Sequence, residues 1–168
     1  MVKLKRKNAI LSVVQYGLLL LVLYILQGLI FPWFMTGFVP LLLCSAVAGV
    51  AHFEGSVKGG VFGLFAGILM DLSLGKPLIV FTIMLTVMGL VIGALGESLL
   101  TKRFISYIFS NIVTLIIAAF VQMFSLLFFT DASVWHLVLT AVLQTVISLI
   151  FAAPLYPIIK RMALKKQE

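Results

Sequence analysis

The chain has 168 residues, of which 63% are hydrophobic and 10% are charged, and its mean hydropathy is +1.27. This composition is typical of an integral membrane protein and excludes a water-soluble globular domain. The net charge of +7 does not indicate a nucleic-acid partner, because eight of the twelve basic residues lie near the two ends, in 3–7 and 160–166. Basic residues placed there suit contact with anionic membrane lipid.

The apolar segments use up nearly all of the chain, so we expect one transmembrane domain over 1–168, with short basic tails at about 1–8 and 160–168. No cleavable signal peptide is expected, because the first apolar run is too long and no small-residue cleavage site closes it. The single cysteine, Cys44, excludes an intramolecular disulfide and a cysteine-cluster metal site.

A membrane-spanning helix needs about 20 apolar residues, and on that basis the sequence predicts an all-α bundle of six spans. The expected spans cover 9–30, 39–53, 60–74, 78–95, 104–129 and 136–159. The expected connections are an aromatic turn at 31–34, a polar link at 54–58, a helix break at 76–77, a polar loop at 97–103 and a turn at 130–135. The second and third spans are short enough to be tilted, broken or partly re-entrant.

The distribution of basic residues predicts the orientation of these spans. With the N-terminus inside, eleven of the twelve basic residues fall on the cytoplasmic side and one, Lys76, falls outside. Cytoplasmic loops carry such an excess of Lys and Arg. We therefore expect both termini to be cytoplasmic and Asp71 to lie near the outer end of the third span.

The third span carries one acidic residue at the end of a glycine-lined apolar run. Glycines recur every four residues on both sides of Asp71, at Gly59, Gly63, Gly67 and Gly75. On a helix this spacing forms a groove in which a neighbouring helix packs backbone to backbone. The fourth span has a second ladder, Gly89 and Gly93. We expect these spans to form a closely packed antiparallel hairpin whose tight turn contains Gly75 and Pro77.

Asp71 has more than one interpretation, because a carboxylate in hydrocarbon costs several kcal/mol unless it is paired or hydrated. It pairs with Lys76 or caps the turn at Gly75, or it is a buried fixed point that orients the turn or contacts a partner. A proton-relay role is disfavoured, since such relays use several ionisable groups at membrane depth. Glu97 is expected to be an exposed loop carboxylate near Lys102 and Arg103.

The residue types needed for catalysis are scarce, and we expect neither an enzyme nor a cofactor or metal site. The two histidines, His52 and His136, fall at span ends on opposite sides of the membrane. His52 with Glu54 offers two potential zinc ligands, whereas zinc takes three or four. No nucleophile elbow, phosphate loop or zinc-protease motif is present.

The polar side chains within the spans are amides and hydroxyls. They include Gln15 and Gln27 on the first span, five residues on the fifth, and Thr140, Gln144 and Ser148 at four-residue spacing on the sixth. In hydrocarbon such groups bond across helices or to their own carbonyls. The alternative is that they line a small ligand cavity, as in the substrate-binding subunit of a transporter.

Two segments together resemble a known family. The first contains Gln27, Pro32 and Pro40: a span ending in Leu-Gln, a short apolar turn, and Gly-x-x-Pro opening the next span. The second, 67–78, reads GILMDLSLGKPL. In this order the chain resembles MreD, a small multi-span protein of the bacterial rod-shape machinery. It departs from that family in having Leu41 where an acidic residue often follows the proline, and Ile79 where glycine often follows Pro-Leu.

The resemblance implies a non-enzymatic scaffold of cell elongation and peptidoglycan synthesis in the bacterial cytoplasmic membrane. It implies an MreC-like single-span partner, and through it indirect contact with MreB, with RodA and with the transpeptidase partner of RodA. Membrane lipid is the remaining expected contact.

The rival interpretation is the substrate-binding subunit of an energy-coupling-factor vitamin transporter, which is also a glycine-rich bundle of about six spans and whose fold the chain is expected to resemble. Those subunits tend to carry an Ala-x-x-x-Ala patch on the first span. Here residues 18–24 read LLLLVLY and are bulky throughout. This difference favours the scaffold.

Overall fold

The computed structural model describes residues 2–34, 39–74, 79–98, 104–129 and 134–164, and in them the chain is helical apart from short connecting segments. The elements in chain order are α1 (Val2–Ile25), a π-helical turn η1 (Leu26–Ile30), α2 (Phe31–Phe34), α3 (Leu42–Glu54), α4 (Ser56–Leu74), α5 (Val80–Ser98), α6 (Phe104–Phe129) and α7 (Val134–Leu164). The predicted all-α class is confirmed for these residues.

Five helical stretches in the described part of the chain are long and apolar enough to cross a membrane. They are Val13–Ile30, Ser56–Ser73, Val80–Ser98, Phe104–Phe124 and Leu137–Ala163. The expected second span differs from the others, because its helix α3 has 13 residues. At 1.5 Å per residue, α3 is about 20 Å long, which is shorter than the roughly 30 Å hydrocarbon core of a bilayer.

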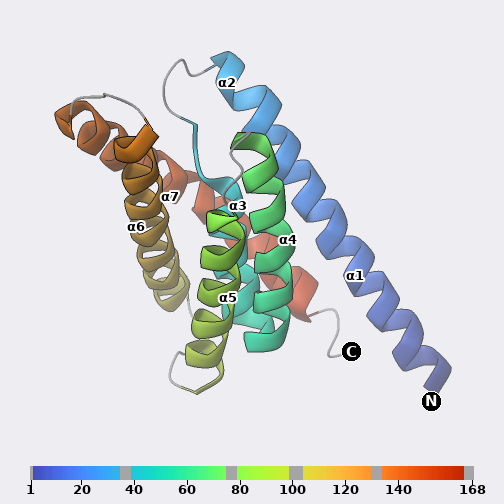
Figure 1. Cartoon of the computed structure of the whole chain (residues 1–168). Helices are drawn as coiled ribbons and strands as arrows, with labels where there is room; N and C mark the ends of the chain where they lie inside the picture. The colour runs from blue at the N-terminus through green and yellow to red at the C-terminus, as the bar shows by residue number, and fades with distance from the viewer. Residues whose placement is uncertain (1, 35–38, 75–78, 99–103, 130–133, 165–168) are drawn as a thin grey trace.

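Helix α3 forms the centre of the bundle (Figure 1). Every residue from Leu42 to Phe53 is buried, and the helix packs against α1, α4, α5, α6 and α7. A helix that is apolar on all sides is expected in such an interior position. In contrast, among the described side chains of α1 only Leu20 and Leu23 are buried. Helix α1 begins and α7 ends at the same end of the bundle (Figure 1).

The prediction of a turn at 31–34 is wrong, because these residues form the short helix α2 directly after η1. The π-helical turn explains the continuation. In η1 the Phe31 N–H donates to the carbonyl of Leu26, five residues back. A widened turn of this kind accommodates a proline that follows it, because Pro32 has no N–H to contribute to a regular ladder.

The predicted polar link at 54–58 is also wrong, since a single residue, Gly55, separates α3 from α4. Gly55 has a φ of +92°, a backbone conformation that favours glycine. The chain reverses its direction there, and Ser56 already belongs to α4.

The first helix begins at Val2, so residues 2–8 of the basic tail expected at about 1–8 are helical and the predicted start at 9 is wrong. Other boundaries shift by a few residues. The expected fifth span coincides with α6. The expected loop at 97–103 begins later, because α5 continues to Ser98. The expected turn at 130–135 ends earlier, because α7 starts at Val134. Residues 99–103 and 130–133, with Lys102 and Arg103, lie outside the described residues, and so do 75–78.

Candidate functional site

Asp71 caps the helix that follows it. Its Oδ1 accepts a hydrogen bond from the Phe81 N–H at 3.1 Å, and its Oδ2 accepts from the Thr82 N–H at 2.9 Å and from the Thr82 Oγ1 hydroxyl at 2.7 Å. Phe81 and Thr82 lie in the first turn of α5, where backbone N–H groups have no partner within the helix. The carboxylate supplies that partner and also opposes the positive end of the helix dipole.

Glu97 makes the matching contact at the other end of the same hairpin. Its Oε1 accepts a hydrogen bond from the N–H of Ser56, the first residue of α4, at 3.2 Å. The Ser56 hydroxyl donates to the carbonyl of Leu90 on α5 at 2.9 Å. Glu97 is exposed, as expected, but it lies on the last turn of α5 and not in a loop. Each helix of the hairpin therefore ends in a carboxylate that caps the start of its neighbour.

The predicted glycine ladder lies along the contact between α4 and α5, which run antiparallel side by side (Figure 1). A Cβ added at Gly67 would lie 2.7 Å from the carbonyl oxygen of Phe81. One added at Gly59 would lie 2.7 Å from the carbonyl oxygen of Gly89. Side chains need more room than this, so at these positions backbone packs directly on backbone.

The other described glycines of the two ladders meet the same kind of neighbour, and a Cβ at Gly89 would fall on the carbonyl of Gly59. A Cβ at Gly63 would fall on the carbonyl of Leu85. A Cβ at Gly93 would lie 2.6 Å from the carbonyl carbon of Gly55, and it would also meet the backbone of Ser56. Of the remaining predicted residues, Gly75 and Pro77 lie outside the described residues. The structure thus brings together Gly59, Gly63, Gly67, Asp71, Gly89 and Gly93 in one hairpin.

The predicted motif residues Gln27 and Pro40 belong to a second arrangement, around the segment that leads into α3. Pro40 is buried, and its carbonyl accepts from the Leu42 N–H at 3.0 Å. The intervening Leu41 has φ −83° and ψ 66°, which are the angles of an inverse γ-turn. Irregular backbone inside a membrane protein needs partners for its polar groups.

Side chains from α7 and η1 supply those partners. Gln144 Nε2 donates to the Val39 carbonyl at 2.6 Å. The Leu41 N–H donates to Ser148 Oγ at 2.7 Å, and Ser148 in turn donates to the carbonyl of Gln144. Gln27 Oε1 accepts from the Leu43 N–H at 3.0 Å. The sequence left two roles open for these amides and this hydroxyl, namely contacts between helices or the lining of a ligand cavity. In the structure they bond to the backbone at the start of α3.

Pro32, the third motif residue, falls within α2, and neither Gln27 nor Pro40 nor Pro32 is part of the glycine hairpin. His52 is buried between Phe53 and Tyr107, whose ring centroids lie 5.1 and 6.4 Å from its own. Among the described residues, no group of three or more His, Cys, Asp or Glu side chains could hold a metal ion.

Three further polar residues meet where α1 approaches the α3–α4 junction, in a contact that the sequence analysis did not predict. The Tyr16 hydroxyl donates to Glu54 Oε1 at 2.9 Å, and the Lys58 ammonium pairs with Glu54 Oε2. Glu54 and Lys58 have opposite charges and are four residues apart in the sequence, although Gly55 places them on different helices. The contribution of Tyr16 has no signal in the local sequence, because it comes from a helix 38 residues away.

These features define a helical multi-pass membrane protein in which polar side chains such as Asp71 and Gln144 make contacts within the bundle. No family model, no curated protein and no solved structure matches the chain.

Proposed function

We propose that this protein is a non-enzymatic scaffold of the bacterial cell-elongation machinery, similar to MreD, in the cytoplasmic membrane. The proposal includes six spans, with α3 and its preceding segment as the second, and both termini on the cytoplasmic side. Its direct partner is an MreC-like protein with one span. Through that partner it connects with MreB, RodA and the transpeptidase partner of RodA.

One observation carries the choice of a scaffold over a transporter subunit. The intramembrane amide of Gln144 and the hydroxyl of Ser148 bond to the backbone just before α3, and the amide of Gln27 bonds to the first turn of α3, at distances of 2.6 to 3.0 Å. In a substrate-binding subunit, comparable side chains would face a ligand. Side chains that already form hydrogen bonds with buried backbone groups make the bundle more rigid, and rigidity is the property that a scaffold needs.

The resemblance to MreD gains support from the place of its most specific motif. Within 67–78, Gly67 packs against the backbone of α5 and Asp71 caps the same helix. Both residues therefore act in assembling the hairpin, which agrees with a motif that serves architecture and not chemistry.

The proposal is tested by co-expressing the tagged chain with the MreC-like protein of the same organism and purifying the tagged chain from detergent-solubilised membranes. We expect the single-span protein to co-purify in a constant ratio through affinity and size-exclusion steps. An unrelated single-span protein, expressed at the same level, is the matched control and should be lost at the first step.

Two results would overturn the scaffold. One is a well-folded, monodisperse chain that retains neither the MreC-like protein nor any other component of the elongation machinery. The other is recovery of the chain with an ATP-driven coupling complex or with a bound vitamin, which would favour the transporter subunit.

A further inference from the structure

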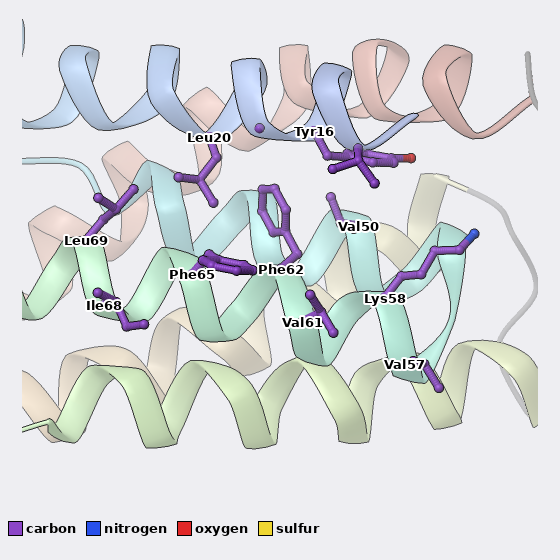
Figure 2. Close-up of a pocket in the computed structure, with 12 residues that line it drawn as sticks. Tyr16, Leu20, Val50, Val57, Lys58, Val61, Phe62, Phe65, Ile68 and Leu69 are labelled. Atoms are coloured by element: carbon purple, nitrogen blue, oxygen red, sulfur yellow. The ribbon is translucent and has the colours of Figure 1, made fainter. Parts of the chain in front are cut away.

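A groove of about 640 Å³ separates α1 from α4. Figure 2 shows side chains of α1, among them Tyr16 and Leu20, on one wall and those of α4, among them Phe62 and Phe65, on the other. Val50 of the central helix α3 also lines it. The groove therefore runs along the one helix of the bundle whose described side chains are mostly exposed.

The described side chains of the chain do not fill this groove. Gly17 lies on the α1 wall, and a Cβ added there would meet nothing within 4 Å. This contrasts with Gly63, Gly67, Gly89 and Gly93 of the α4–α5 hairpin, which meet backbone at once. On the rim, Val13, Val61 and Phe65 are 72%, 54% and 57% exposed, so the groove is open sideways to the membrane.

The polar groups of the groove are gathered at one end. In Figure 2 the Tyr16 hydroxyl and the Lys58 ammonium lie toward the same end, whereas Leu20, Ile68 and Leu69 extend away from it. Glu54 accepts from both polar groups. The Lys58 side chain is also 45% exposed. The groove thus has an apolar length and a polar end at which a partly exposed ammonium lies.

The volume of the groove, about 640 Å³, fits a hydrocarbon chain. Binding sites for small ligands have volumes of about 300 to 1,000 Å³, and one acyl chain of a lipid is of this size class.

The surrounding charge favours an anionic headgroup. Lys58 lies at the start of α4, and α1 begins and α7 ends at that same end of the bundle (Figure 1). The sequence places Lys3, Lys5, Arg6 and Lys7 at the start of α1 and Lys160 and Arg161 near the end of α7. Against these stand the carboxylates of Glu54 and Glu97. Such a basic end attracts anionic lipid of the adjacent leaflet.

We propose that the groove between α1 and α4 binds one anionic phospholipid, with an acyl chain along Gly17, Leu20, Val61 and Phe65 and its phosphate at Lys58. The lipid completes the packing of α1 against the bundle. This inference does not depend on the proposed scaffold function, because it concerns a lipid and not a protein partner.

The test uses the full chain in vesicles of phosphatidylcholine with a minority of phosphatidylglycerol carrying a photoactivatable acyl chain. After illumination, mapping by mass spectrometry should place most cross-links on α1 and α4 peptides that line the groove, several-fold above the lipid-exposed α6. Gly17→Phe, which fills the groove from α1, should lower this labelling several-fold. Ile83→Phe, at a 65% exposed position of α5, is the matched control and should not.

Two additional variants keep the test decisive. Val61→Phe fills the groove from the α4 wall and should reproduce the loss if Gly17→Phe does not fold, as judged by size-exclusion profile. Lys58→Gln should bring labelling by phosphatidylglycerol down to that by phosphatidylcholine carrying the same photoactivatable chain. Uniform labelling of all lipid-facing helices, or labelling insensitive to Gly17→Phe and Val61→Phe, would overturn the proposal. So would a Gly17→Cys variant that cross-links to a second copy or to a partner helix in place of lipid.

Discussion

The acidic residues of this chain are few, and the described ones all have specific partners. Of the five in the sequence, Asp71 and Glu97 cap the two helices of the α4–α5 hairpin, and Glu54 joins Tyr16 to Lys58. A carboxylate at a membrane-spanning helix end is costly unless such partners are present. The contacts explain why these charges are compatible with a chain that is otherwise so apolar.

Replacing Asp71 tests the value of the cap. Asp71→Ala removes the acceptor of three hydrogen bonds. The N–H groups of Phe81 and Thr82 in α5 then lose this acceptor. We expect a loss of about 2 kcal/mol in the free energy of unfolding, since helix caps and bonds to a charged acceptor have this size. Unfolding in detergent micelles, followed by circular dichroism, measures the loss.

Two variants serve as controls for that measurement. Asp71→Asn keeps one oxygen acceptor and should lose less than Asp71→Ala. Glu97→Ala should also lose less, because Glu97 is exposed and the structure gives it one backbone bond. An Asp71→Ala variant as stable as the parent chain would contradict the capping role.

At the scale of elements, the α4–α5 hairpin is held by direct backbone contact. The glycines are not equivalent there, because their neighbours differ. A Cβ at Gly63 would meet the backbone of Leu85, whereas one at Gly60 would meet the side chain of Leu90 and one at Gly17 would meet open space. A side chain can rotate away, but the backbone of a packed helix cannot.

This difference predicts a graded series of substitutions to alanine. Gly63→Ala should destabilise the fold by about 1 to 3 kcal/mol, the usual cost of overpacking. Gly60→Ala should cost less, and Gly17→Ala should be neutral or stabilising, because alanine favours helix by up to about 1 kcal/mol over glycine. Thermal unfolding of the three variants under one detergent condition measures the order.

The larger substitution Gly63→Leu should disrupt the hairpin altogether, whereas Val61→Leu, at a position 54% exposed on the same helix, should remain within about 0.5 kcal/mol of the parent. Equal stability of all these variants would show that the ladder is not a close-packed surface.

For the whole molecule, the central feature is a short buried helix surrounded by longer ones. Helix α3 cannot cross the membrane by its length. The segment before it lies within the bundle, bonded to Gln144 and Ser148, and Gln27 bonds to the first turn of α3 itself. This arrangement is compatible with six passes through the membrane, with α1 starting and α7 ending on one side (Figure 1).

Accessibility of introduced cysteines tests the orientation. The natural Cys44 is buried, so the parent chain should not react with a membrane-impermeant maleimide until it is denatured. In the proposed topology Trp33→Cys, at an 86% exposed position, should react from outside intact cells. Ser98→Cys, exposed at the end of α5, should react only in inside-out vesicles. Reaction of both cysteines from the same side would contradict the six-span arrangement.

Much of this architecture follows from local sequence. Apolar length and glycine spacing locate α4, α5, α6 and α7 to within a few residues, because membrane helices satisfy their own backbone and their limits depend on hydropathy. Two expected connections are wrong, the turn at 31–34 and the link at 54–58. A π-helical turn before Pro32 and the positive φ of Gly55 are backbone adjustments that composition does not reveal.

The sequence by itself determines that this is a helical membrane protein with a glycine-faced pair of helices and a single acidic residue on the third apolar stretch, since these depend on residue type and spacing alone. The tertiary structure decides which groups meet: Asp71 with Thr82, Glu97 with Ser56, and Gln144 with Val39 across 105 residues. Such pairs depend on how helices that are distant in the chain are placed. The sequence shows that an amide or a carboxylate is present, but not which group it binds. The groove beside Gly17 is likewise a consequence of how α1 approaches α4, and no local pattern specifies that approach.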